Sequence, residues 1–96
     1  MLHLISQSPI DKALLDRIDK GDDVVFVENA VLQILQKGHL SYLLTQLIKK
    51  NQLFVLADDI LVRGITAKEL VADIQVIDYL DLVDLTVKNK LIQSWC

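Results

Sequence analysis

The sequence predicts an α/β domain with a single open, mostly parallel five-stranded sheet and helices on both of its faces. Strand-like apolar runs alternate with helical patterns along the chain, and this order is typical of a parallel sheet. Two of the runs, 24–27 and 53–56, are apolar without interruption, as expected for strands that helices cover on both sides. The length of 96 residues fits one domain over residues 1–96.

The first predicted elements are a strand, a helix and a second strand. Leu2–Ile5 has the apolar side chains of a short strand. Ser8 can serve as an N-cap and Pro9 fits the first helical position, so we expect a helix that begins at Ser8 and ends before Gly21. The β-branched and aromatic run 24–27 is the second strand.

The middle of the chain predicts short helices around a third strand. Residues 29–50 contain two amphipathic helical patterns separated by a glycine, and Ser41 is placed to cap the second. The run 53–56 is the third strand, and Asp58 is expected to cap a short helix after it. The sequence TAKE at 66–69 has the form of a capping box, which predicts another short helix.

A strand, a helix and an edge strand complete the predicted fold. Residues 74–77 are the fourth strand. Asp78 then caps a helix over Tyr79–Lys88. Residues 91–95 alternate between apolar and polar side chains, which favours an edge strand.

The composition indicates a domain that is partly covered by another chain. Apolar residues make up 52% of the chain, and the mean hydropathy is +0.37. This is high for a small domain, which leaves a large share of its surface in water. No apolar run approaches the ~20 residues that cross a bilayer, and no export signal precedes the first strand. We therefore expect a cytoplasmic protein that does not contact the membrane.

The charge distribution argues against direct binding of nucleic acid. The net charge is −3 and the isoelectric point is about 5.1. The basic residues are scattered, with Lys49 and Lys50 as their only adjacent pair, whereas nucleic-acid binding depends on clustered Lys and Arg.

The polar residues form no pattern typical of a cofactor, nucleotide or metal site. Glycine-rich phosphate-binding motifs are absent, and one cysteine excludes an internal disulfide or a multi-cysteine zinc site. Asp78, Asp81 and Asp84 recur every three residues, but a cap and two solvated acids near a helix N-terminus explain them. Asp84 also has the spacing to pair with Lys88. We expect no cofactor and no metal ion.

The last two residues each leave two interpretations open. Trp95, the only tryptophan, either closes the core of the domain or contacts a neighbouring subunit, because aromatic residues are enriched in interface hot spots. Cys96 is either a persulfide carrier or an incidental tail residue. The carboxylate next to it disfavours the thiolate that a sulfur acceptor needs, so we expect no catalytic residue.

The most characteristic stretch is DIQVIDYLDLVDLTVK at 73–88, which predicts strand, cap and helix and is followed by QSW at 93–95. The chain also contains MLHLI at 1–5, SP at 8–9, GDDVVFV at 21–27 and DILVRG at 59–64. Together these stretches resemble the TusB/DsrH family, small subunits of bacterial sulfur-relay complexes. The resemblance spans the whole chain.

This resemblance implies a DsrE-like α/β fold and membership of a complex. Family members assemble with TusC/DsrF-like and TusD/DsrE-like subunits into a heterohexamer made of two copies of the trimer. The complex passes persulfide sulfur from a TusA-like donor to a TusE/DsrC-like acceptor. In the Tus branch the sulfur ends in the 2-thiouridine of a tRNA wobble position, and in the Dsr branch it belongs to sulfur oxidation.

Two departures from the family's cysteine positions favour the Tus branch and a non-catalytic role. The principal sulfur-carrying cysteine of the relay belongs to the TusD/DsrE-like subunit, and the comparable loop here is LADD at 56–59. Some DsrH-like members have a cysteine near the end of the first helix, where this chain has KGDD at 20–23.

The resemblance therefore predicts a non-catalytic subunit of a TusBCD-type sulfurtransferase complex that supports tRNA 2-thiouridylation. One alternative is a sulfur-carrying subunit of a DsrEFH-type complex in sulfur oxidation. The other is a homo-oligomeric regulatory or ligand-binding module unrelated to sulfur.

Overall fold

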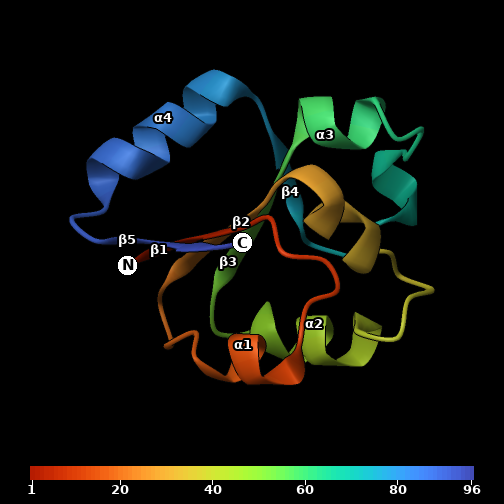
Figure 1. Ribbon diagram of the computed structural model, residues 1–96, viewed down its shortest axis with the longest axis horizontal. Helices are drawn as coiled ribbons and strands as arrows, with labels where there is room; N and C mark the ends of the chain where they lie inside the picture. The colour runs from red at the N-terminus through yellow and green to blue at the C-terminus, as the bar shows by residue number, and fades with distance from the viewer.

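The computed structural model describes residues 1–96 and contains one five-stranded sheet in which every neighbouring pair of strands is parallel (Figure 1). The strand order is β4-β3-β2-β1-β5. The strands are β1 (Leu2–Ile5), β2 (Asp23–Phe26), β3 (Gln52–Leu56), β4 (Gln75–Ile77) and β5 (Ile92–Trp95). The predicted fold class is confirmed, and β5 is an edge strand as expected.

Four α-helices and two 3₁₀ segments connect the strands. They are α1 (Lys12–Asp16), η1 (Glu28–Gln33), α2 (Ser41–Leu47), α3 (Ala57–Leu61), η2 (Ala67–Glu69) and α4 (Tyr79–Lys88). Figure 1 shows α1 and α2 on one face of the sheet and α4 on the opposite face. No helix is both long enough and apolar enough to span a bilayer.

The two faces of the sheet are covered very unequally. The face toward α1 and α2 belongs to a core of 18 buried residues, which includes Val24, Phe26 and Val55. The face toward α4 has a cluster of only four buried residues. They are Leu2, Val25, Phe54 and Ile77. Because side chains alternate along a strand, each central strand contributes to both cores.

The helix predicted to begin at Ser8 begins later, so that prediction is wrong. Its N-cap residue is Asp11, and α1 covers only Lys12–Asp16. After β1 the backbone still follows β5, since the N–H groups of Ser6 and Gln7 both donate to the carbonyl of Trp95. This pairing holds the chain out of a helical conformation at the position where the sequence favours one.

The first helical pattern within 29–50 forms a 3₁₀ segment rather than an α-helix. The chain leaves η1 to pair with the segment before β4. The Val71 N–H donates to the carbonyl of Ile34 at 3.0 Å, and the Gln36 N–H donates to that of Glu69 at 2.8 Å. Long-range pairing therefore ends the helix early.

Two predicted caps lie inside their helices. Ser41 is the first residue of α2, which continues from the preceding turn with Leu40 at the N-cap position. Asp58 lies in the first turn of α3, because β3 passes directly into this helix with Leu56 as N-cap. Both helices exist as predicted, but their starts are set by the preceding backbone.

The helix α4 has the predicted bounds and the predicted cap. Asp78 accepts a hydrogen bond from the Asp81 N–H at 2.8 Å, and its own N–H donates to the Asp81 carboxylate at 3.2 Å. The predicted pair between Asp84 and Lys88 is wrong, because Lys88 lies 3.6 Å from the buried carboxylate of Asp23 instead.

Candidate functional site

The carboxyl edge of the sheet is the first place to look for a site, since the loops after parallel strands meet there. Here the loops after β2 and β3 are joined by hydrogen bonds. The Glu28 N–H donates to the Asp59 carboxylate at 2.7 Å. Arg63 donates to the side-chain oxygen of Asn29 at 2.9 and 3.2 Å and to the Asp59 carbonyl at 3.0 Å.

This cluster holds a backbone conformation that is uncommon outside glycine. Glu28 has φ = 52°, in the left-handed region. The short bond to Asp59 fixes its N–H, and Arg63 lies 3.8 Å from the same carboxylate. Asp59 lies in the first turn of α3 and also fixes the loop after β2. The cluster contains no thiol or hydroxyl nucleophile.

The three aspartates of α4 do not converge on a ligand. Asp78 and Asp81 are engaged with each other's backbone, as described above, and Asp84 is exposed. No three His, Cys, Asp or Glu side chains of the structure come together as a metal-binding group.

A buried polar network lies where the first and last strands meet. The Trp95 Nε1–H donates to His3 Nδ1 at 3.1 Å, and His3 Nε2 lies 2.8 Å from an Asp22 carboxylate oxygen. An indole N–H can only donate, so Nδ1 is the acceptor and the ring proton sits on Nε2, from which it is donated to Asp22. The other Asp22 oxygen lies 3.2 Å from the amine of Met1.

The network stabilises the ionised form of Asp22. Burial raises the pKa of this carboxyl, but the hydrogen bonds from His3, the Met1 amine and the Asp19 N–H outweigh burial and hold the pKa below its usual value. His3 is only 2% exposed. This arrangement is structural, since both ring nitrogens of His3 are occupied.

Trp95 and Cys96 have very different surroundings. Trp95 is partly buried against the main core, and the Arg17 guanidinium lies 5.8 Å from the centre of its ring. Cys96 is exposed beyond the end of β5, and none of the hydrogen bonds or ion pairs involves its thiol.

The sequence could not have revealed the link between His3 and Trp95. They are 92 positions apart and become neighbours only because β5 pairs with β1 rather than with β4. The one available signal was that each lies in a predicted strand.

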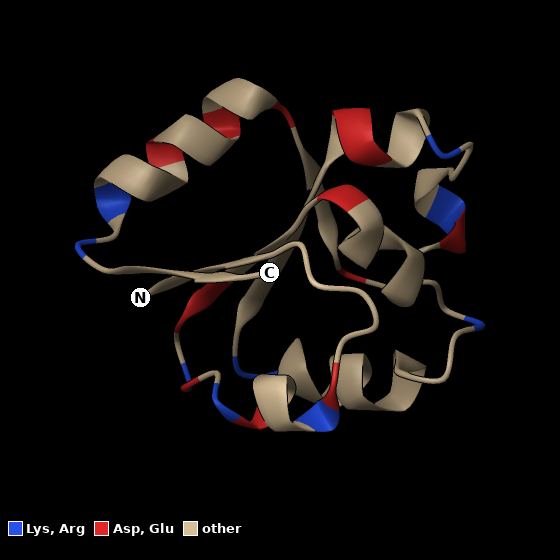
Figure 2. Ribbon diagram, in the orientation of Figure 1, with Lys and Arg blue, Asp and Glu red and all other residues tan.

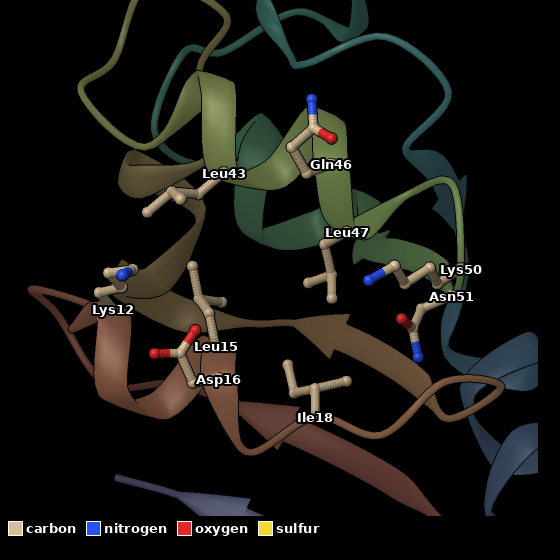
Figure 3. A pocket seen from close by; sticks show the side chains of 9 residues that line it. All are labelled: Lys12, Leu15, Asp16, Ile18, Leu43, Gln46, Leu47, Lys50 and Asn51. Carbon is tan, nitrogen blue, oxygen red and sulfur yellow. The ribbon is translucent and has the colours of Figure 1, made fainter.

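A cavity of about 240 Å³ lies between α1 and α2 (Figure 3). Its apolar part is formed by Leu15, Ile18, Leu43 and Leu47. Lys12 and Lys50 lie at opposite ends of the view, so the two cations do not converge on one point. Asn51 uses its side-chain N–H groups to bind the carbonyls of the turn before β2 and has no hydrogen-bond partner for its oxygen. No nucleophile and base are paired here.

Comparison with known proteins identifies the family. Residues 7–91 match the family model described as "DsrH like protein". The chain is 32% identical to "Protein TusB" of Cronobacter sakazakii over 98 residues, covering 99% of this chain and 100% of that protein. It is 33% identical to "Protein TusB" of Pectobacterium parmentieri and 30% identical to that of Buchnera aphidicola, with the same coverage.

A solved structure supports the fold. A protein of unknown function from Methanobacterium thermoautotrophicum superimposes with a TM-score of 0.79, covering 97% of this chain and 96% of that chain at 12% sequence identity. At this identity the likeness concerns the fold alone. The matches to the family model and to its full-length relatives show that the chain belongs to the TusB/DsrH family, as its sequence motifs indicated.

Proposed function

We propose that this chain is a non-catalytic subunit of a Tus-type sulfurtransferase complex in the cytoplasm. In this role it supports the relay of persulfide sulfur toward 2-thiouridine at the tRNA wobble position. The observation that carries the proposal is the full-length similarity to proteins named TusB. Its expected partners are one TusC/DsrF-like and one TusD/DsrE-like subunit in a heterohexamer, which exchanges sulfur with a TusA-like donor and a TusE/DsrC-like acceptor.

The surroundings of the only cysteine support a non-catalytic role. A persulfide carrier needs a thiolate, which nearby cations, histidines or helix N-termini stabilise. Cys96 lies beyond the last strand without such a group hydrogen-bonded to it. Persulfide chemistry is therefore assigned to a partner subunit.

Exposed apolar side chains support the proposed role as a subunit of a complex. Twelve large apolar side chains are exposed, including Tyr42, Leu61, Val62 and Val87, each more than 70% accessible. Contiguous apolar patches mark protein–protein contacts, and Tyr79, Leu80, Val83 and Val87, all exposed, share one side of α4. The apolar excess of the composition is thus located at the surface as well as in the core.

Gentle purification of the tagged chain from its own host, followed by native mass spectrometry, tests the proposal. We expect an equimolar complex with two related small subunits, one of which carries a cysteine that can be persulfidated. Recovery of the chain without such partners, under conditions that preserve complexes, would contradict the proposal.

Replacement of the single thiol tests the non-catalytic role separately. The Cys96→Ser variant should support tRNA thiolation at the rate of the parent chain, because the thiol carries no sulfur in this proposal. Loss of thiolation with an intact complex would instead identify this chain as a sulfur carrier.

A further inference from the structure

The cavity between α1 and α2 is bordered by one buried polar group that lacks a partner. Asn51 is only 6% exposed, and its side-chain nitrogen donates to the carbonyls of Asp19 and Asp22 at 2.6 and 3.0 Å. These bonds fix the orientation of the amide, since only its nitrogen can donate to a carbonyl. The side-chain oxygen is therefore the free atom, and no group of the domain donates to it.

The orientation of Asn51 turns this oxygen toward the cavity. In Figure 3 the oxygen lies on the side of Leu47, and the nitrogen points away from it. Buried polar atoms of proteins nearly always have a hydrogen-bond partner, because an unpaired one lowers the stability of the fold. A free acceptor in the wall of a cavity fits a ligand that carries a hydrogen-bond donor.

Lys50 provides a second polar group at the same end of the cavity. Its side chain lines the cavity next to Asn51 (Figure 3). None of the ion pairs of the structure involves its amine, which is thus free to bind an anion. The residue is exposed, so its long side chain can move and admit a ligand to the Asn51 oxygen.

Aliphatic side chains form the middle of the cavity, and they are Leu15, Ile18, Leu43 and Leu47. Asp16 is the only carboxylate of the lining, and it lies near Lys12 at the far end of the view (Figure 3). Sites for small molecules are typically concave and largely apolar, with a few polar groups that orient the ligand. The volume of about 240 Å³ suits a ligand of modest size.

We propose that this cavity binds a small 2-hydroxy carboxylate with a branched aliphatic side chain. The carboxylate pairs with the Lys50 amine, the hydroxyl donates to the Asn51 oxygen, and the side chain lies against Ile18 and Leu47. A hydroxyl is favoured over an ammonium as the donor, because the cation of Lys50 is close and no carboxylate of the lining lies at this end. The site does not depend on a role of the chain in sulfur relay.

Two ligands that differ by one hydroxyl test the contact with Asn51 and leave its hydrogen bonds to the turn intact. The probe is 2-hydroxy-4-methylpentanoate, and 4-methylpentanoate is the control. NMR titration of the labelled chain should show shifts of the Asn51 side-chain amide and of the Ile18 and Leu47 methyl groups. The hydroxy acid should bind about five-fold more tightly, as expected for one hydrogen bond. Equal affinities, or no shifts of these groups at millimolar ligand, would overturn the proposal.

Replacement of Lys50 tests the contact with the carboxylate. Lys50→Met removes the charge and keeps an unbranched side chain, and Lys49→Met is the matched control, since Lys49 is exposed and does not line this cavity. Lys50→Met should weaken binding of the hydroxy acid at least several-fold, while Lys49→Met should leave it unchanged. The amide spectrum of each variant establishes that it is folded. Equal weakening by both variants would show a general attraction of anions and would refute a specific site.

Discussion

At the scale of single residues, Asp22 has the most consequential contacts in the molecule. It lies in the turn before β2 and accepts hydrogen bonds from His3 of β1, from the Met1 amine and from the Asp19 N–H. Through His3 it is connected to Trp95 of β5. From the sequence, Asp22 belongs only to the family-like stretch GDDVVFV at 21–27 and to KGDD at 20–23, where some DsrH-like members have a cysteine, because nothing local shows these contacts.

Asp22→Asn should destabilise the fold in a pH-dependent manner. Loss of a charged acceptor should lower the free energy of unfolding by about 1–3 kcal/mol at pH 7. Because the pKa of Asp22 is below its unfolded value, this contribution is present above about pH 4 and disappears as the pH falls through the folded pKa. Urea unfolding at pH 7 and pH 3 measures it. Asp16→Asn, at an exposed carboxylate without partners, should change stability little at either pH, and a pH-independent effect of Asp22→Asn would contradict the role of its charge.

At the scale of elements, agreement between prediction and structure depends on whether local or distant groups set a boundary. The bounds and cap of α4 were predicted because Asp78 and Asp81 satisfy each other's backbone within four residues. The start of α1 was not predicted, because the preceding N–H groups of Ser6 and Gln7 donate to the carbonyl of Trp95, which is distant in the sequence. In the same way, the early end of η1 depends on pairing with residues 69–71.

The cap of α4 provides a prediction at this scale. Asp78→Ala removes the acceptor for the Asp81 N–H and should cost about 1 kcal/mol of stability, whereas Asp78→Ser should retain most of it. Urea unfolding followed by far-ultraviolet circular dichroism measures both. Equal losses for the two variants would mean that the side chain acts through its charge rather than as a cap.

At the scale of the whole molecule, stability is concentrated on one side of the sheet. The core beneath α1 and α2 contains 18 buried residues, while the α4 side contains four and α4 itself buries none of its residues. The sequence predicted helices on both faces but could not predict this inequality, because apolar residues occur on both sides of α4. Tyr79 and Val83 are exposed, although nothing in the sequence separates them from Leu82, which packs on the sheet.

Hydrogen exchange of the isolated chain should reveal this inequality. Amides in β2 and β3 should exchange only through global unfolding, since Val24, Val25 and Val55 are fully buried. Amides in α4 should exchange much faster through local opening, because few buried contacts hold the helix. Residue-resolved exchange by NMR measures both, and protection of α4 equal to that of β2 would contradict this account.

The order of strands in the sheet also affects how the chain can fold while it is being made. β1 is the first strand synthesised, yet one of its two neighbours, β5, is the last. Until residues 92–95 have left the ribosome, one edge of β1 has unpaired backbone N–H and C=O groups beside an apolar core. Unpaired strand edges can form β-sheet hydrogen bonds with other chains and so promote aggregation. Protection of the nascent sheet therefore depends on residues 92–95, and premature termination before β5 leaves this edge of β1 unpaired.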